Sequence, residues 1–336
     1  MVERFAVPVC LTWGFADGLP EASPYRIGTF GTHGTRAANF AVQNADFILS
    51  IGARLDTKAT GTPQSNFARG ARIVMCDIDP LELGKMERLG LIVQPYCEDA
   101  KVSLNRDWPL RSNGEWLARC QDWKRRYPPG PGEAYEIVEE LSRLCEPGEI
   151  IVCDTGCAVA WMMQAFKFKE DQRFIHAFNQ TPMGYGLPAV IGAHYATGKR
   201  VIYVAGDGSI MPNIGELATI AGHDLPIKIV LFDNKGHAMC RQTQREWLGG
   251  TYPATGIEGG LRFPEWSEYL LGAGIAVFGS INMLMAVAGP ACYVAQISED
   301  ADVVPKNKFG KPIEEMYPEL PREEFLEQMI VKPVDD

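Results

Sequence analysis

The chain has 336 residues, of which 46% are hydrophobic and 22% are charged, and its formal net charge is −10 at pH 7. This is the composition of an ordinary globular protein, and the length is sufficient for two domains. The acidic balance argues against a nucleic-acid-binding surface, which requires clustered Lys and Arg. No apolar run approaches the ~20 residues of a membrane-spanning helix. We therefore expect neither a nucleic acid nor a membrane as a partner.

The amino terminus and the cysteines indicate the cellular compartment in which we expect the protein. The first ten residues do not have the pattern of a signal peptide. The nine cysteines are an odd number at irregular spacing, and no CxxC pair occurs. This usage indicates reduced thiols in a cytoplasmic protein, rather than a disulfide framework or a zinc site.

Residues 1–105 form a first block of α/β character. Residues 36–44 predict a helix, and the apolar runs 45–52 and 71–77 predict buried strands. Asp77, at the end of the second run, has two interpretations: a ribose ligand, as in dinucleotide folds, or a cap of the helix near Pro80. Residues 28–34 do not fit GxGxxG, so the block carries no independent dinucleotide signal.

Residues 106–132 separate the first block from a second one. They are polar, rich in Trp, Arg and Pro, and end in Pro-Pro-Gly-Pro-Gly. This much Pro and Gly predicts a linker. Within it, the Lys- and Arg-bearing residues 119–126 are interpreted as the solvated face of a helix.

Residues 133–336 form the second block, in which helical and strand patterns alternate. Helices are predicted at 134–145, 159–166, 186–197 and 263–271, and strands at 149–153, 173–178, 200–205, 227–232 and 291–297. Such alternation predicts a mainly parallel sheet with helices on both faces. The predicted fold class is therefore α/β, with two mainly parallel, three-layer domains. The carboxyl-terminal tail predicts a short helix followed by an extended end.

Two strand ends in the second block carry oxygen ligands. Gly206-Asp207-Gly208 follows the strand at 200–205, and Asn234 follows the strand at 227–232. A carboxylate, an amide oxygen and a backbone carbonyl just beyond suit Mg²⁺, and open α/β folds bind ligands at this edge of the sheet. The pattern predicts a Mg²⁺-diphosphate anchor. The alternative for both residues is turn chemistry, since Asp and Asn commonly end strands.

The spacing and the flanking sequence carry a family resemblance. Asn234 lies 27 positions after Asp207, as in the thiamine-diphosphate motif. Together with the runs at 31–46, 51–56, 181–193 and 206–219, this makes nearly the whole chain resemble the acetolactate synthase large subunit. The resemblance implies that residues 1–105 are part of the central domain and that 133–336 are the diphosphate-binding domain.

The family's third domain, which binds the pyrimidine of the cofactor, has no counterpart in these residues. It contains the Glu that activates the cofactor, so no catalytic residue is assigned here. The resemblance implies that upstream sequence or a pyrimidine-domain partner chain supplies this Glu, and that the protein forms a homo-oligomer.

The resemblance also implies which residues bind thiamine diphosphate and Mg²⁺. The metal ligands would be Asp207, Asn234 and the carbonyl of Gly236. The diphosphate would lie against Gly206, Asp207, Gly208 and Ser209 and against a second loop, Gly156, Cys157 and Ala158. The thiamine part would contact the Thr181 carbonyl, Met183, His237 and Met239. For Met183 the alternative is core filling, and for His237 it is an exposed loop position.

Two further matches concern FAD and the second substrate. Many family members bind FAD in the central domain, and the matching positions here are Gly31, Thr32, His33, Gly52, Ala53, Arg54 and Asp77. His33 could equally be a structural residue in a turn. Thr243 stands where acetolactate synthases carry a Trp that shapes the acceptor pocket, which suggests a different acceptor.

The expected function is thiamine-diphosphate- and Mg²⁺-dependent decarboxylation and carboligation of a 2-oxoacid such as pyruvate. The chain would supply the diphosphate half of the site. Three alternatives remain: a 2-oxoacid decarboxylase completed by a separate pyrimidine-domain chain, a non-catalytic cofactor-binding or subunit-interaction fragment, and a nucleotide-binding protein that uses only the first block.

Overall fold

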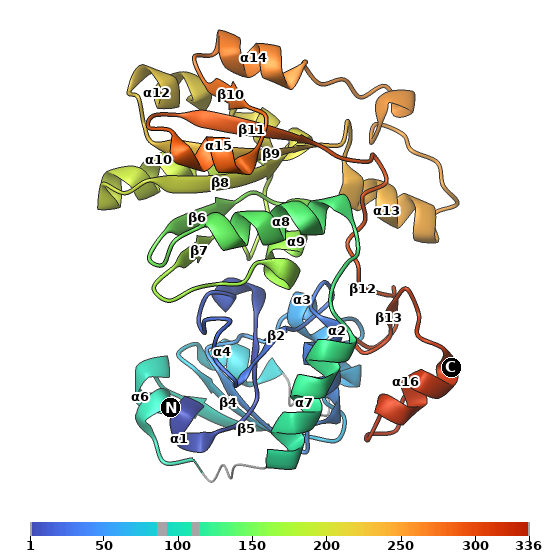
Figure 1. Ribbon diagram of the computed structural model, residues 1–336. Coiled ribbons are helices and arrows are strands. Elements are labelled where there is room, and N and C mark those ends of the chain that lie inside the picture. The colour runs from blue at the N-terminus through green and yellow to red at the C-terminus, as the bar shows by residue number, and fades with distance from the viewer. Residues whose placement is uncertain (1, 86–92, 109–113, 335–336) are drawn as a thin grey trace. The chain divides into compact units, whose positions relative to one another are not determined.

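A computed structural model describes residues 2–85, 93–108 and 114–334 (Figure 1). The chain forms two compact units. Unit 1 comprises residues 1–13, 23–129 and 304–336, and unit 2 comprises residues 14–22 and 130–303.

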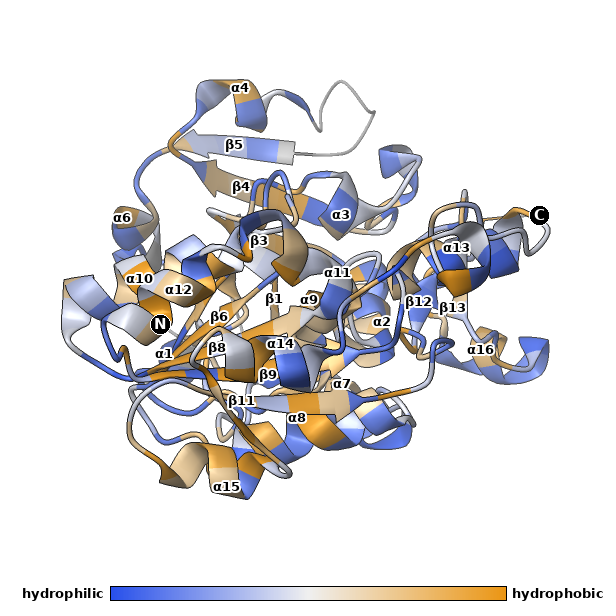
Figure 2. Ribbon diagram, turned by 90° about the horizontal axis from the view of Figure 1, so that it is seen from above, coloured by the Kyte–Doolittle hydropathy of each residue, from blue (hydrophilic) through white to orange (hydrophobic). Residues whose placement is uncertain are grey.

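Unit 2 is built on a six-stranded, all-parallel sheet. Its strands are β6 (Ile150–Cys153), β7 (Arg173–Ile175), β8 (Val201–Gly206), β9 (Ile227–Asp233), β10 (Ala276–Phe278) and β11 (Ala291–Gln296). Their spatial order is β10-β11-β9-β8-β6-β7. The central strands β8 and β9 are almost fully buried apolar runs, as expected for a parallel sheet covered on both faces. Figure 2 shows the hydrophobic colouring along β6 and β8.

Helices cover both faces of this sheet. One face packs on α10 (Gly186–Thr197), α12 (Glu216–Gly222) and α14 (Trp266–Gly272), whose Val190, Leu217 and Leu270 join the buried core. The other face packs on α9 (Cys157–Ala165), where the Trp161 ring lies 5.1 Å from that of Phe232, and α9 packs on α8 (Glu133–Leu144). The remaining elements are α11 (Asp207–Ile210), η3 (Met211–Asn213), α13 (Ala238–Trp247), η4 (Ile257–Gly259) and α15 (Ile281–Ala286).

Unit 1 contains a three-stranded parallel sheet in the order β3-β4-β5 and a parallel pair β1-β2. The strands are β1 (Val9–Leu11), β2 (Arg26–Thr29), β3 (Phe47–Ile51), β4 (Arg72–Asp77) and β5 (Val93–Cys97), and a short antiparallel pair follows later in the chain, β12 (Lys306–Asn307) with β13 (Met316–Tyr317). The helices are α1 (Val2–Phe5), α2 (Arg36–Asn44), α3 (Thr57–Thr60), α4 (Pro80–Leu83), α6 (Ala100–Asn105), α7 (Gly114–Arg126) and α16 (Arg322–Gln328), with the short turn η2 (Gln64–Asn66). The short turn η1 (Trp13–Phe15) begins at the last residue of a unit 1 segment and continues into unit 2.

The α/β fold class and its parallel sheets are confirmed, and the long predicted elements are present. Helices 36–44 and 186–197 have the predicted limits, and the other predicted elements differ by a few residues at their ends. Several elements had no prediction, among them β2, β5, β10, α12 and α15. These are short, and a short apolar run does not distinguish a strand from a helix.

The compact units differ from the predicted domain limits at three places. Residues 14–22, which were predicted in the first domain, belong to unit 2. Residues 114–126 of the predicted linker form α7, which packs on α2 in unit 1; residues 109–113 lie outside the described residues. The tail from residue 304 belongs to unit 1 and not to the second unit. Helix α7 has the predicted solvated face, but Cys120 and Trp123 on its other face are buried.

Trp123 shows why α7 is part of the core of unit 1. Its side chain is 1% exposed, its ring lies 5.6 Å from that of Phe40, and its indole N–H donates to Gln328 Oε1 at 3.0 Å. One residue thus joins α7 to α2 and to α16.

We predict that Trp123→Ala lowers the free energy of unfolding by about 3–5 kcal/mol, because it leaves a cavity between three helices. Chemical denaturation measures this change. The control Arg125→Ala removes an exposed side chain of the same helix and should change stability by no more than about 0.5 kcal/mol. Equal effects of the two substitutions would contradict the assignment of α7 to the core.

Candidate cofactor-binding site

The predicted site residues of unit 2 follow the carboxyl ends of adjacent strands. Strand β8 lies between β6 and β9, whereas β7 lies on the other side of β6. The chain therefore leaves β6 and β8 toward opposite sides of the sheet, which is the switch point where open α/β sheets bind ligands. The loops after β6, β8 and β9 meet at this edge.

Asp207 connects the ends of β8 and β9. Its side chain is buried, and its Oδ2 accepts from the backbone N–H groups of Asn234 at 3.1 Å and Gly236 at 3.2 Å. Its Oδ1 accepts from the N–H of Gly208 at 2.6 Å. Burial, and to a lesser extent the neighbouring Asp233, raises the pKa of Asp207 to about 7. Its hydrogen bonds with backbone N–H groups oppose this rise.

Asn234 and its neighbours complete an oxygen donor set. The Asn234 side chain is buried, and its Nδ2 has no hydrogen-bond partner among the described residues. Rotation of the Asn234 side-chain amide by a half-turn would place its oxygen where Nδ2 now lies. Gly236 must lack a side chain, because a Cβ there would lie 2.6 Å from the Thr255 carbonyl oxygen.

These residues fit Mg²⁺, which prefers a carboxylate, an amide and a carbonyl oxygen. Within the described ranges, no group of three or more His, Cys, Asp and Glu side chains is placed to hold a metal ion. The predicted set does not require one, since only Asp207 among its members belongs to these types.

The turn at 206–209 is closed by Ser209. Its Oγ accepts from the Gly206 N–H at 3.0 Å and donates to the Gly206 carbonyl at 3.1 Å. Gly208 lies close to the His237 ring. A Cβ at position 208 would lie only 2.4 Å from His237 Nδ1. The structure therefore brings together the two loops that carry the predicted metal ligands.

The second predicted diphosphate loop offers open space. Gly156 has φ of +99°, and nothing lies within 4 Å of the position that a Cβ would occupy. Cys157 and Ala158 are buried in the first turn of α9. An open cradle at the start of this helix suits an anion, because the first N–H groups of a helix have no partner inside the helix.

The residues predicted to contact thiamine lie on two other segments. Met183 is 47% exposed, and Thr181 has φ of +47°, an uncommon conformation for a residue with a side chain. His237 precedes α13 and donates its N–H to the Thr255 carbonyl at 3.0 Å, and burial lowers the pKa of its ring. Met239 is half-buried in the first turn of α13.

Asp154 and Tyr203 were not predicted from the sequence. Asp154 directly follows β6, is fully buried, and accepts a hydrogen bond from Tyr203 Oη at 2.9 Å. The signal in the sequence that could have identified Asp154 is its position, because it is an acidic residue at the end of a predicted parallel strand. Three of its four hydrogen-bond donors lie 30 or more positions away, so their convergence could not be inferred.

The residues matched to an FAD site lie in unit 1 and have structural partners. Gly31 donates its N–H to Asn39 Oδ1 at 2.8 Å, and Arg54 pairs with Glu82 at 3.1 Å. Gly52 and Ala53 follow β3, and Thr32 precedes His33 in the loop after β2. FAD therefore stays a prediction.

The cap interpretation of Asp77 is corrected. Helix α4 is capped by Asp79, whose Oδ1 accepts from the Leu81 N–H at 2.8 Å. Asp77 instead accepts from the Asp79 N–H at 2.9 Å and so shapes the preceding turn. Two acidic residues lie within three positions, and the one next to Pro80 is the better placed to cap.

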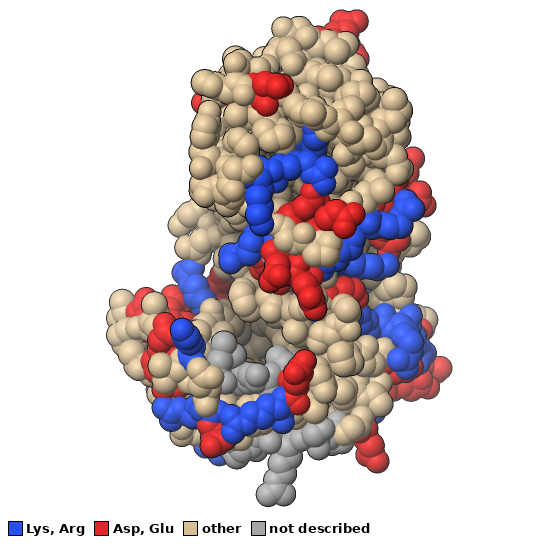
Figure 3. Space-filling model, turned by 60° about the vertical axis from the view of Figure 1, so that its left-hand side comes forward, with Lys and Arg blue, Asp and Glu red and all other residues tan. Residues whose placement is uncertain are grey.

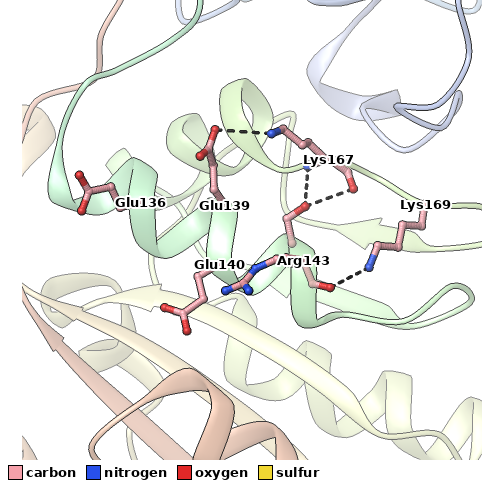
Figure 4. Close-up of a pocket in the computed structure, with 7 residues that line it drawn as sticks. Glu136, Glu139, Glu140, Arg143, Lys167 and Lys169 are labelled. Atoms are coloured by element: carbon pink, nitrogen blue, oxygen red, sulfur yellow. Dashed lines mark hydrogen bonds and ion pairs between the residues drawn. The ribbon is translucent and has the colours of Figure 1, made fainter.

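A separate pocket in unit 2 does not involve these loops. It lies between α8 and the segment 167–169, and it is lined by Glu136, Glu139, Glu140, Ser142, Arg143, Lys167 and Lys169 (Figure 4). Lys167 pairs with Glu139 at 3.7 Å, and Lys169 Nζ donates to the Arg143 carbonyl at 3.0 Å. Lys167 and Glu139 thus form an ion pair within this pocket, and Lys169 is held by a backbone carbonyl.

Two family descriptions match the chain. "Thiamine pyrophosphate enzyme, central domain" matches residues 1–105, and "Thiamine pyrophosphate enzyme, C-terminal TPP binding domain" matches residues 154–290. Together they cover more than half of the sequence. The chain belongs to the thiamine pyrophosphate enzymes. Thiamine pyrophosphate is another name for thiamine diphosphate.

Relatives of the chain include acetolactate synthase large subunits. It is 34% identical over 273 residues to that of Parasynechococcus marenigrum, which is 78% of this chain and 44% of the relative. It is 32% identical over 343 residues to that of Porphyra purpurea (93% and 56%) and 28% identical over 310 residues to isozyme 1 of Escherichia coli K12 (90% and 51%). The chain thus spans about half the length of these relatives.

No helix in the described part of this thiamine pyrophosphate enzyme is long and apolar enough to cross a membrane.

We predict that His33 makes the stability of unit 1 depend on pH. Burial, followed by the charges of Lys306 and Lys58, lowers the pKa of its ring to about 3. The unfolded chain binds a proton near pH 6.5 that the folded chain does not bind, so stability decreases as the pH falls below about 6.5. Between pH 7.5 and pH 5 the loss should be up to about 2 kcal/mol.

Chemical denaturation at these two pH values measures the loss, which should shrink in His33→Gln. His223→Gln, at an exposed position, is the control and should behave as the parent does. An unchanged pH dependence in His33→Gln would show that the histidine does not titrate in this way.

Proposed function

We propose that this chain supplies the diphosphate half of the active site of a Mg²⁺- and thiamine-diphosphate-dependent enzyme of the acetolactate synthase type. Such an enzyme decarboxylates a 2-oxoacid such as pyruvate and joins the remaining unit to a second carbonyl compound. The observation that carries the proposal is the pair of strand ends fixed by Asp207, where Asn234 and Gly236 lie beside a buried carboxylate.

Each loop at this edge has a task in the proposed site. Asp207, Asn234 and the Gly236 carbonyl hold Mg²⁺, while the cradle at Gly156 and the turn at 206–209 receive the diphosphate. When bound, thiamine diphosphate supplies the electron sink that lets CO₂ leave. Thr181, Met183, His237 and Met239 orient its thiamine part.

The proposed site also needs the Glu of a pyrimidine-binding domain, from upstream sequence or from a partner chain. Helix α10 supports such a partner. It contains no Asp, Glu, Lys or Arg, and several of its residues are exposed on the side away from the core, including Pro188, Tyr195 and Ala196. The upper part of the face in Figure 3, on the side of α10 and α12, carries few charged side chains. A helix that is apolar all round is normally covered.

The proposal does not fix the acceptor, which is the second carbonyl compound of the reaction. Thr243 lies half-buried on α13, and its hydroxyl donates to the Met239 carbonyl at 3.0 Å. A threonine leaves more room than the tryptophan of the acetolactate synthases, so the acceptor pocket would have a different shape.

A non-catalytic protein that binds the cofactor or another subunit is the second candidate. Its support is the uncharged, exposed side of α10, which suits contact with another subunit. Both candidates bind Mg²⁺ and thiamine diphosphate. They differ in turnover of pyruvate once a pyrimidine-binding domain is supplied.

We predict that Asn234→Ala and Asp207→Asn each weaken binding of thiamine diphosphate in the presence of Mg²⁺ by about tenfold or more, because the first removes a metal ligand and the second removes the negative charge of one. Titration calorimetry on the purified chain measures the affinity. Asn234→Ala is the cleaner variant, since the amide nitrogen that it removes has no partner in the described residues.

Glu149→Gln provides a matched control. Glu149 is a buried acid just before β6, at the opposite edge of the sheet, and it pairs with Arg200 at 2.7 Å. This variant should bind the cofactor as the parent does. Equal affinities of the parent, Asn234→Ala and Asp207→Asn would defeat the proposed metal site, and rapid pyruvate turnover by the chain alone would defeat the proposed need for a partner.

A further inference from the structure

Asp154 is a buried acid that the proposed function has not yet used. It follows β6 at the switch point of the sheet, and its side chain is fully buried. Removing a carboxylate from water is costly unless hydrogen-bond donors replace the water. Burial raises the pKa of Asp154, and its hydrogen bonds oppose this effect.

Four donors converge on this carboxylate. Oδ1 accepts from the N–H groups of Thr155 at 2.9 Å and Gly184 at 3.1 Å. Oδ2 accepts from the N–H of Gly186 at 3.0 Å and from Tyr203 Oη at 2.9 Å. An ionised carboxylate can accept all four bonds, whereas an asparagine would turn an N–H₂ group toward two of the donors.

These donors come from three segments. Thr155 begins the loop that carries the cradle at Gly156, and Tyr203 lies in the middle of β8. Gly184 and Gly186 belong to the segment 181–186 that carries Met183. A single carboxylate therefore fixes the spacing between the predicted diphosphate cradle and the predicted thiamine contact.

Further contacts restrain the backbone of segment 181–186. Asn213 Nδ2 donates to the Gly184 carbonyl at 2.7 Å. A Cβ at Gly184 would lie 2.8 Å from Pro212, and a Cβ at Gly186 would lie 2.1 Å from the Tyr203 ring. Met183, half-exposed, thus projects from a segment whose backbone is held on both sides.

We propose that Asp154 is a positioning residue, which holds Met183 and the Thr181 carbonyl at a fixed distance from the diphosphate cradle. This inference rests on the proposed function, because it assigns the thiamine contact to this segment. It adds that the Asp154 carboxylate fixes the position of this thiamine contact. Asp154 itself does not touch the cofactor.

Two measurements on the purified chain test the proposal in Asp154→Asn. The first is hydrogen exchange without ligand, in which at least one of the Gly184 and Gly186 amides should exchange about tenfold faster or more, because the asparagine keeps an acceptor oxygen for only one of the two. The second compares two ligands in the presence of Mg²⁺. Affinity for thiamine diphosphate should fall about tenfold, whereas affinity for inorganic diphosphate should change by less than about threefold.

A merely structural role would move both affinities alike. Glu149→Gln is again the matched control, because it removes a charge from a buried acid beside the same strand without touching segment 181–186. It should leave the exchange of Gly184 and Gly186 and the ratio of the two affinities unchanged. If circular dichroism shows that Asp154→Asn does not fold, Tyr203→Phe, which removes only one donor, is measured in the same way and should show smaller changes in the same direction.

Unchanged exchange at Gly184 and Gly186, or equal losses for the two ligands, would overturn the positioning role. A parent chain that binds neither ligand would overturn the proposed function together with this role. That result is distinguishable from failure of the positioning role alone, in which the parent binds both ligands and the variant binds them with unchanged affinity or with the same loss for each.

Discussion

The Asp207 carboxylate is the constraint on which the candidate site depends. By accepting the N–H groups of Asn234 and Gly236, it fixes the end of β9 relative to the end of β8. Without this bond pair, the amide and the carbonyl that follow β9 would have no defined distance from the turn at 206–209. The same carboxylate is a proposed metal ligand, so the group that builds the site is also part of it.

Asp154 fixes the loop after β6 relative to segment 181–186, just as Asp207 fixes the end of β8 relative to the end of β9. Both acids directly follow parallel strands, and both accept backbone N–H groups from distant segments. In each case burial opposes ionisation, and N–H donors favour it. Two buried carboxylates thus organise this edge of the sheet.

The sequence predicted the fold class, and it predicted that the segments after β8 and β9 lie together, because both features are expressed in local patterns. Buried parallel strands are continuous apolar runs, and the spacing from Asp207 to Asn234 is read directly. Asp154 and Tyr203 were missed since their contact joins positions 49 apart. The polar stretch around α7 resembled a linker, because Trp116, Cys120 and Trp123 form only one apolar stripe among charged residues.

The return of the chain to unit 1 after residue 303 affects how the protein is made. Asn39 donates to the Ile313 carbonyl, and Asn44 donates to the Gln328 carbonyl, so the helix α2 near the amino terminus is completed by residues close to the carboxyl terminus. During synthesis, the early part of unit 1 must wait for the whole stretch 130–303, roughly ten seconds or more. Unit 2 can close its sheet in that interval. The chain thus acquires its cofactor-binding half before its other half has a complete core.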